Sequence, residues 1–136
     1  MLKVDFTNET VYSFEGPNLC MLGKPEDFKA LGKIILALTD INANKEIDIT
    51  ERDFIEMAGN NCKVLFSSKE GANSWGILKT NNIILFELDY RIWERIFQFT
   101  ALLSWDKLTY YLNKYEAGIN DFDLIQDCNI IWSSEF

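Results

Sequence analysis

Residues 83–103 read IILFELDYRIWERIFQFTALL, and this stretch decides the fold class. Its first four residues, Ile83 to Phe86, form an apolar run that predicts a buried β-strand. Asp89 then opens a segment in which apolar residues recur every three or four positions, which predicts a helix to Leu103. This helix is apolar on several sides, so we expect it to lie centrally, with other elements around it.

Apolar periodicity predicts two further main helices. Residues 25–41 begin with a proline and two acidic residues, which favour a helix start, and continue with a single apolar stripe. Residues 104–118 carry apolar side chains at helical spacing between a serine that suits the N-cap and a glycine that suits the stop. A brief helix is also expected over residues 50–57.

Short apolar or alternating runs predict the strands. They fall at residues 2–6, 11–14, 45–49, 62–66, 75–79, 83–86 and 129–132. Asn81 and Asn82 suit a tight turn, because asparagine tolerates positive φ. The last three strands before residue 89 are joined by short loops, which implies antiparallel pairing. The order of elements predicts one α+β domain over residues 1–136, with a mainly antiparallel sheet and three main helices.

Composition supports a globular protein without structural staples. Hydrophobic residues make up 48% of the 136 residues, which suffices for a core. The cysteines Cys20, Cys62 and Cys128 are odd in number and scattered, which predicts free thiols and argues against a disulfide framework or a zinc site. No apolar leader opens the sequence and its longest apolar run, residues 34–38, is too short for a bilayer. We therefore expect a cytoplasmic protein with no cofactor.

Charge and the lack of histidine narrow the function. The sequence has 21 acidic and 13 basic residues, a net charge of −8, and no histidine. It therefore lacks the side chain that most often transfers protons near neutral pH, and its surface repels nucleic acid. No P-loop, G-x-G-x-x-G or G-x-S-x-G motif occurs. These features predict a non-enzymatic binding protein with a basic protein partner.

Acidic residues concentrate in two segments. Residues 115–136 hold five acidic residues and no basic one, and residues 40–56 hold six acidic and two basic residues. If the fold joins the two segments, the resulting patch would steer a basic partner. The competing interpretation is that both segments are solvated loops that serve solubility.

The candidate binding residues come from these segments and from nearby aromatic residues. The acidic candidates are Asp121, Asp123, Asp127, Glu116, Glu51 and Asp53. The aromatic candidates are Tyr110, Phe122 and Trp75, because tyrosine, phenylalanine and tryptophan are enriched at protein interfaces. The remaining tryptophans, Trp93, Trp105 and Trp132, are expected in the core.

In these respects the chain resembles the immunity proteins of bacterial polymorphic toxin systems. The likeness is that of a small, acidic, aromatic-rich α+β chain without catalytic motifs, and its nearest local signature is residues 93–115 with residues 130–134. The resemblance implies a protein that binds a cognate toxin, often a basic nuclease or deaminase, and blocks its active site. The acidic segments would then stand in for nucleic-acid phosphates.

Two other hypotheses remain open at this point. The chain could be a structural or adaptor module, or a homo-oligomer subunit, that uses an apolar face; the strongly apolar segment from Tyr90 to Leu103 is its sequence hint. It could also be a carboxylate- or metal-dependent enzyme built on the aspartates of residues 121–127 or on Glu51 and Asp53.

Overall fold

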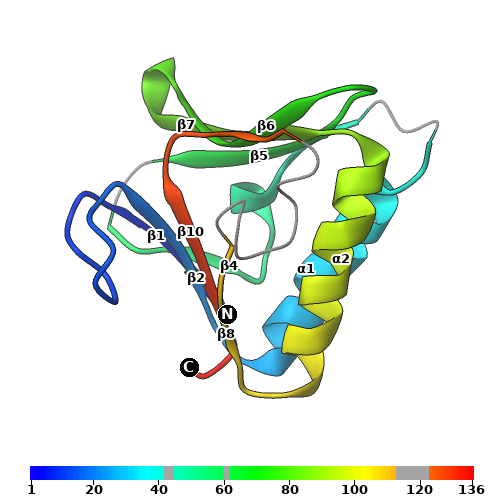
Figure 1. The fold of residues 1–136 in the computed structure, drawn as a ribbon. Helices are drawn as coiled ribbons and strands as arrows, with labels where there is room; N and C mark the ends of the chain where they lie inside the picture. Colours follow the sequence, from blue (N-terminus) through cyan, green and yellow to red (C-terminus); the bar gives the residue numbers. More distant parts are fainter. Residues whose placement is uncertain (42–44, 60–61, 113–122) are drawn as a thin grey trace.

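The computed structural model describes residues 1–41, 45–59, 62–112 and 123–136. These residues form two helices and two five-stranded sheets (Figure 1). The helices are α1 (Pro25–Leu38) and α2 (Tyr90–Trp105), with short 3₁₀ helices η1 (Ile49–Glu51) and η2 (Thr80–Asn82). The strands are β1 (Leu2–Thr7), β2 (Asn18–Leu22), β3 (Glu46–Asp48), β4 (Ile55–Met57), β5 (Lys63–Ser68), β6 (Asn73–Lys79), β7 (Ile83–Leu88), β8 (Thr109–Tyr111), β9 (Ile125–Gln126) and β10 (Asn129–Ser133). None of the helices in the described ranges is long and apolar enough to cross a membrane.

Both sheets are mixed. Sheet 1 has the strand order β4-β1-β2-β10-β8, and sheet 2 has the order β3-β5-β7-β6-β9. Among the described strands four neighbouring pairs are antiparallel and four are parallel. The α+β class is confirmed, but a mainly antiparallel sheet is not observed. Strands distant in sequence, such as β2 and β10, lie side by side and run in the same direction.

Strands β5, β6 and β7 were expected to pair antiparallel in chain order, and their positions show why that expectation is incorrect. β7 lies between β5 and β6, parallel to β5 and antiparallel to β6. Every second residue of β7 is buried and the others are half-buried, so the strand has no exposed position. A strand of this kind is best accommodated inside a sheet, and the edge positions fall to shorter strands.

Two of the predicted helices are confirmed, and they pack against each other on one side of the sheets (Figure 1). Gly32 allows the close approach, because a Cβ atom there would lie 3.0 Å from Oγ1 of Thr100. The expected central position of α2 is incorrect, since one face of this helix is exposed to solvent. Its exposed residues are Arg91, Glu94, Arg95, Gln98, Leu102 and Trp105.

The third main helix is not observed. Ser104 belongs to the last turn of α2, where its hydroxyl donates to the carbonyl of Ala101, and Thr109–Tyr111 form strand β8 instead. Residues 113–118 of the expected helix lie outside the described residues. The apolar spacing over this segment fits a helix, but its threonine and tyrosines favour a strand once β10 is beside them.

Two smaller elements also differ from expectation. Residues 50–57 form η1, whose N-cap is Asp48, followed by strand β4. Residues 11–14 form a tight hairpin turn, and the strand that pairs antiparallel with β1 is β2. The expected turn at Asn81 and Asn82 is confirmed, with φ of 63° and 59°.

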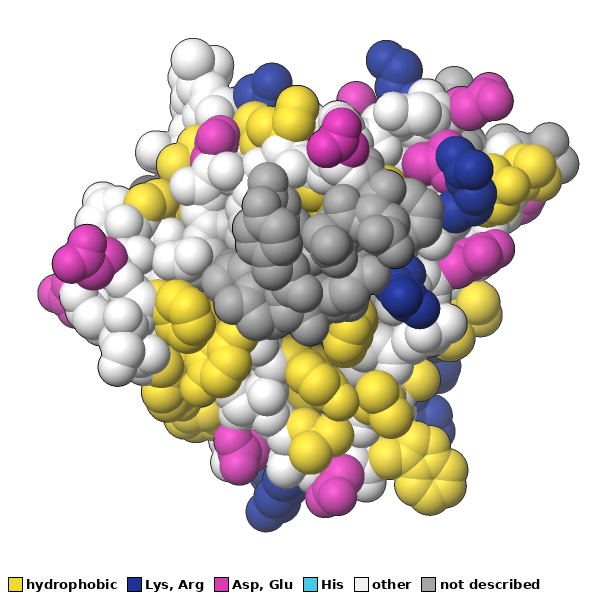
Figure 2. Space-filling view, in the orientation of Figure 1, with side chains coloured by type: hydrophobic (Ala, Val, Ile, Leu, Met, Phe, Trp, Pro, Cys, Tyr) yellow, Lys and Arg dark blue, Asp and Glu magenta, His cyan; other side chains and the backbone are white. Residues whose placement is uncertain are grey.

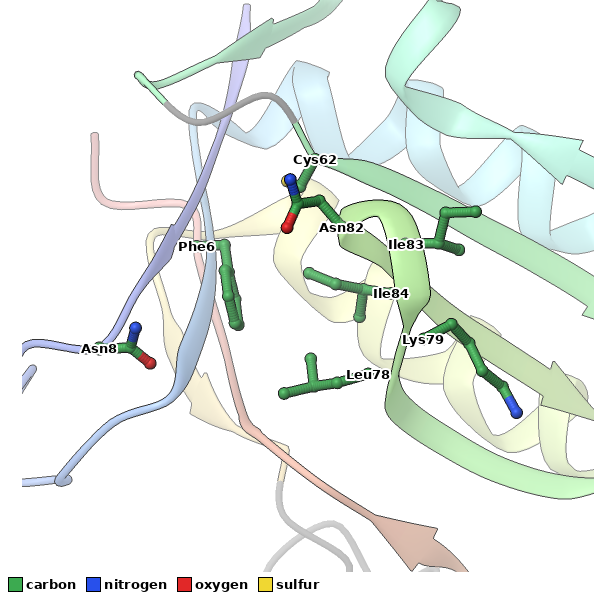
Figure 3. A pocket seen from close by; sticks show the side chains of 8 residues that line it. All are labelled: Phe6, Asn8, Cys62, Leu78, Lys79, Asn82, Ile83 and Ile84. Carbon is green, nitrogen blue, oxygen red and sulfur yellow. The ribbon is translucent and has the colours of Figure 1, made fainter.

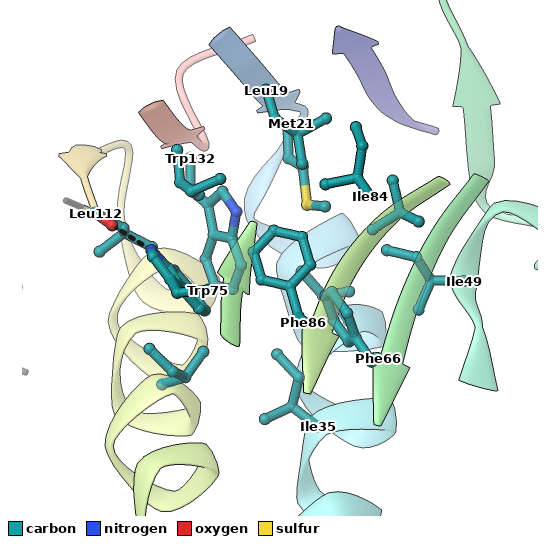
Figure 4. Packing of buried hydrophobic residues seen from close by; sticks show 14 of the residues in the cluster. Leu19, Met21, Ile35, Ile49, Phe66, Trp75, Ile84, Phe86, Leu112 and Trp132 are labelled. Atoms are coloured by element: carbon teal, nitrogen blue, oxygen red, sulfur yellow. Dashed lines mark hydrogen bonds between the residues drawn. The ribbon is translucent and has the colours of Figure 1, made fainter. Parts of the chain in front are cut away.

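Six aromatic rings join the two sheets and both helices in one core. Figure 4 shows Phe66, Phe86, Trp75 and Trp132 among them. In order of contact they are Trp93, Phe66, Phe86, Trp75, Trp132 and Phe28, with ring centroids 4.8 to 6.5 Å apart. Two of the indoles also donate to backbone carbonyls, Trp93 to Ser67 and Trp75 to Leu112. The elements are therefore coupled through side chains that are wholly buried.

Candidate functional site

The two acidic segments do not meet in the described part of the fold. Glu51 and Asp53 are exposed beside β3, at one edge of sheet 2, whereas Asp123 and Asp127 are exposed beside β9, at the other edge. Strands β5, β7 and β6 separate them, so the two edges lie about 19 Å apart at 4.8 Å per strand spacing. They therefore form two surfaces instead of one patch.

The aspartates next to β9 also have structural contacts. The Asp127 carboxylate accepts a hydrogen bond from the backbone N–H of Leu78 at 3.0 Å. The backbone carbonyl of Asp123 accepts one from the Asn73 side chain at 2.9 Å. Both contacts fasten the β9 segment to β6. Three further candidates, Glu116, Asp121 and Phe122, lie outside the described residues.

The burial of the tryptophans departs from expectation at two positions. Trp75, expected at the surface, is wholly buried, and its indole N–H donates to the carbonyl of Leu112 at 2.7 Å. Trp105, expected in the core, is 88% exposed at the end of α2. Trp93 and Trp132 are buried, as expected. Trp75 therefore cannot contact a partner.

Five aromatic residues gather around the edge strand β8, and we call this surface the β8 flank. Its members are Tyr12, Phe14, Phe99, Tyr110 and Tyr111. On one side of the strand, Tyr111 packs against Phe14 and Tyr12, with ring centroids 5.1 and 6.0 Å apart. On the other side, Tyr110 packs against Phe99 at 5.1 Å. Tyr12 is 49% exposed, and Phe14 and Tyr111 are partly exposed beside it. Phe99 and Tyr110 are partly exposed but also pack against the core, so the cluster is most open to solvent at Tyr12.

The hydrogen-bond pattern of β8 leaves half of its backbone facing away from the sheet. Leu112 donates to Ile130, and Ser134 donates to Leu108, so the even-numbered residues of this segment face β10. In an antiparallel ladder the alternate residues, Thr109 and Tyr111, then direct their N–H and C=O groups outward. Among the described strands none pairs with this outer edge.

Exposed acidic residues lie on the segments that adjoin the β8 flank. Trp75 connects β9 to the β8 flank. The Trp75 indole donates to the carbonyl of Leu112 at the end of β8, and the Trp75 backbone pairs with Gln126 of β9. Figure 2 shows hydrophobic side chains gathered over β8 and the lower end of α2, with acidic side chains below this area and to its left. The exposed acidic residues on the adjoining segments are Glu9, Glu15, Asp106, Asp123, Asp127 and Glu135.

A cavity of about 320 Å³ opens on a different part of the molecule, between β1 and the turn that joins β6 to β7 (Figure 3). The side chains of Phe6, Leu78 and Ile84 face its interior, and Lys79 points away from it. Its described lining includes one thiol, Cys62, and burial raises the pKa of that thiol. A neutral thiol without an adjacent base is a poor nucleophile, so this cavity supports no catalytic assignment.

The other two thiols are also buried. Burial, with a smaller contribution from Asp5, raises the pKa of Cys20 to about 11, and burial with Asp127 raises the pKa of Cys128 to about 12. All three cysteines are free, as expected. Within the described residues no group of three or more cysteine, aspartate or glutamate side chains is placed to hold a metal ion.

Most of the β8 flank was not predicted from the sequence. Of its five members only Tyr110 was a candidate, because Tyr12 and Phe14 were placed in a strand and Phe99 on a broad helix face. A tyrosine and a serine between Val11 and Phe14 give no signal for a two-residue turn, which normally contains Asn-Gly. No pattern in the sequence could have shown that Tyr12 packs beside Tyr111, or that Phe99 packs beside Tyr110.

Comparison with protein-family models, with curated proteins and with solved structures found no match to this chain.

Proposed function

We propose that this chain is a non-enzymatic binding protein of the immunity-protein type, which inhibits a basic toxin domain through the β8 flank and its acidic rim. The observation that carries the proposal is an aromatic cluster, open to solvent on an edge strand, with six exposed carboxylates on the adjoining segments. Tyrosines supply contact area to an interface, and the surrounding carboxylates steer a cationic partner to it.

The net charge of −8 also favours a basic partner. Nuclease domains bind nucleic acid through lysine and arginine, so an inhibitor with carboxylates at the rim of its contact surface competes with phosphate for the same groups. The outward N–H and C=O groups of β8 add a second mode of contact, because an extended segment of the partner can pair with them.

The experiment is co-expression of this chain with basic toxin domains encoded beside its gene, read as cell growth, followed by a binding titration on the pair that is rescued. Wild-type protein is expected to restore growth and to bind with an affinity that falls as salt rises. The triple variant Glu9→Lys, Glu15→Lys, Asp123→Lys is expected to bind at least about tenfold more weakly, mainly through slower association.

A matched control is available on the opposite acidic surface. The triple variant Glu51→Lys, Asp53→Lys, Glu56→Lys changes the net charge by the same amount at exposed positions. We expect it to retain affinity close to wild type. Equal losses in both variants would show that only net charge matters, and a loss confined to the control would move the interface to the Glu51 side.

An adaptor module or homo-oligomer subunit is the alternative function. Its supporting observation is the apolar surface left open on the helices, where Leu36, Leu102 and Trp105 are 54%, 49% and 88% exposed. Salt-insensitive self-association of the purified protein would favour it over the inhibitor.

A further inference from the structure

The helix pair has a charge opposite to that of the remaining chain. Helices α1 and α2 together hold four basic and three acidic residues, whereas the whole chain has a net charge of −8. One of the three acidic residues, Asp27, is buried at the start of α1, where its carboxylate accepts from the N–H of Lys24. The solvent side of the helices is therefore basic on an acidic protein.

A groove of about 210 Å³ runs between α1 and α2 on this side. Its lining residues are Phe28, Lys29, Gly32, Lys33, Leu36, Phe97, Thr100, Ala101 and Ser104. Small side chains form the bottom of the groove. Gly32 of α1 packs closely against Thr100 of α2, and the neighbouring residue Ala101 also lines the groove. The floor is thus apolar, and the charged residues of the lining are the two lysines of α1.

Neither lysine is engaged within the protein. Lys29 and Lys33 are exposed, and their ammonium groups have no ion-pair or hydrogen-bond partner among the described residues. They lie four residues apart on one helix, so both extend from the same rim of the groove. Their position favours a ligand with carboxylates along one side.

Trp105 extends the apolar surface at the lower end of the groove. It is 88% exposed and lies one helical turn after Ala101, so the two residues share a face of α2. Tryptophan is the residue type most enriched among the energetically dominant positions of protein interfaces. An almost fully exposed tryptophan beside an apolar groove therefore indicates a surface that another molecule covers.

We propose that this groove binds an acidic amphipathic helix of another protein, forming a second interface that is independent of the β8 flank. The apolar face of that helix fills the groove and contacts Trp105, and its flanking carboxylates pair with Lys29 and Lys33. The lining residues of α1 run from Phe28 to Leu36, a stretch about 12 Å long, so the groove contacts about two turns of the bound helix.

The test uses two synthetic amphipathic peptides of about four turns with the same leucine and phenylalanine face. One carries glutamate along its flanks and the other carries lysine. Binding to the full chain is measured by titration calorimetry at about 0.15 M salt, where charges beyond about 8 Å are screened. The overall charge of −8 favours the lysine peptide, whereas the groove lysines favour the glutamate peptide, so the two electrostatic effects oppose each other.

We expect the glutamate peptide to bind at least about tenfold more tightly than the lysine peptide. The variant Lys29→Glu, Lys33→Glu should remove or invert this preference. The variant Lys63→Glu, Lys79→Glu, with the same charge change at the end of sheet 2 away from the helices, should retain it (Figure 1). Filling the floor with Ala101→Met should weaken the binding of the glutamate peptide, and thermal unfolding confirms that each variant is folded.

Several results would overturn the proposal. They are equal binding of the two peptides, a preference for the lysine peptide, and no binding of either. A fourth is that NMR shows the backbone amide shifts caused by the glutamate peptide on the β8 flank instead of on α1 and α2. Concentration-dependent self-association that the glutamate peptide cannot displace would assign the groove to a second copy of the chain and would equally overturn it. None of these results bears on the toxin-inhibition experiment, which tests the β8 flank.

Discussion

At the scale of single residues, Asp89 shows how one side chain connects two parts of the fold. Its carboxylate caps α2 by accepting from the N–H and the guanidinium of Arg91, and it also accepts from the N–H of Gly71 in the loop before β6. Burial would raise the pKa of this carboxyl, but these hydrogen bonds and the Arg91 charge outweigh burial and lower the pKa to about 2.

The substitution Asp89→Ala is expected to lower the free energy of unfolding by about 2 kcal/mol at neutral pH, because it removes the cap and leaves two N–H groups unpaired. Since the pKa of Asp89 is lower in the folded than in the unfolded state, its charge stabilises the protein above about pH 4, and that stabilisation is lost as the pH falls towards 2. Asp89→Asn keeps a cap but not the charge. Urea unfolding at several pH values should therefore show a shallower acid loss for Asp89→Asn than for wild type, and equal slopes would contradict this account.

At the scale of elements, the segment between β1 and β2 presents Tyr12 to solvent on an unfavourable turn. Val11 and Phe14 bond to each other through both N–H groups, at 2.9 and 2.8 Å, which leaves Tyr12 and Ser13 as the two central residues. Their φ angles are 48° and 71°. A two-residue turn with two positive φ angles is type I′, which strongly prefers Asn-Gly, so this sequence stabilises the turn less than it could.

The variant Tyr12→Asn, Ser13→Gly is expected to raise the free energy of unfolding by about 1 kcal/mol, because it relieves two unfavourable backbone conformations. It also removes an exposed ring from the β8 flank. If the proposed function holds, affinity for the toxin domain should fall although stability rises. Ser13→Gly alone is the control, since it should stabilise the turn without loss of affinity; a loss of stability in both variants would refute the type I′ assignment.

At the scale of the whole molecule, the buried aromatic rings couple both sheets and both helices. Trp75 of sheet 2 packs against Trp132 of sheet 1, with ring centroids 6.5 Å apart. Trp132 packs against Phe28 of α1, with ring centroids 6.1 Å apart. Phe66 of sheet 2 in turn contacts Trp93 of α2 at 5.0 Å. Neither sheet can separate from the helices without exposing part of this chain of rings to water.

We therefore expect the protein to unfold as one cooperative unit. Transitions followed by tryptophan fluorescence and by far-ultraviolet circular dichroism should coincide. Phe86→Ala should lower the free energy of unfolding by about 4 kcal/mol, because this ring is wholly buried between Phe66 and Trp75. Leu36→Ala, at a position 54% exposed, should cost less than about 1 kcal/mol. Two separated transitions would show that the sheets form independent units.

The helices and the central strands could be predicted from the sequence because their signals are local. The apolar periods of α1 and α2, the apolar run of β7 and the asparagine pair before it are properties of adjacent residues. The candidate site was accessible only in part. The acidic segments and Tyr110 were identified from composition, but their separation to opposite edges of sheet 2 and the burial of Trp75 were not.

The sequence by itself therefore determined the secondary structure with strong periodicity, the acidic charge and the absence of histidine chemistry. Only the tertiary structure decided the short edge strands, the strand order and which aromatic residues are exposed. Residues 109–111 become a strand because β10, some twenty residues later, supplies hydrogen-bond partners. Trp75 and Trp105 exchange their expected places because burial depends on which distant elements pack over a residue, and not on the residues beside it in the chain.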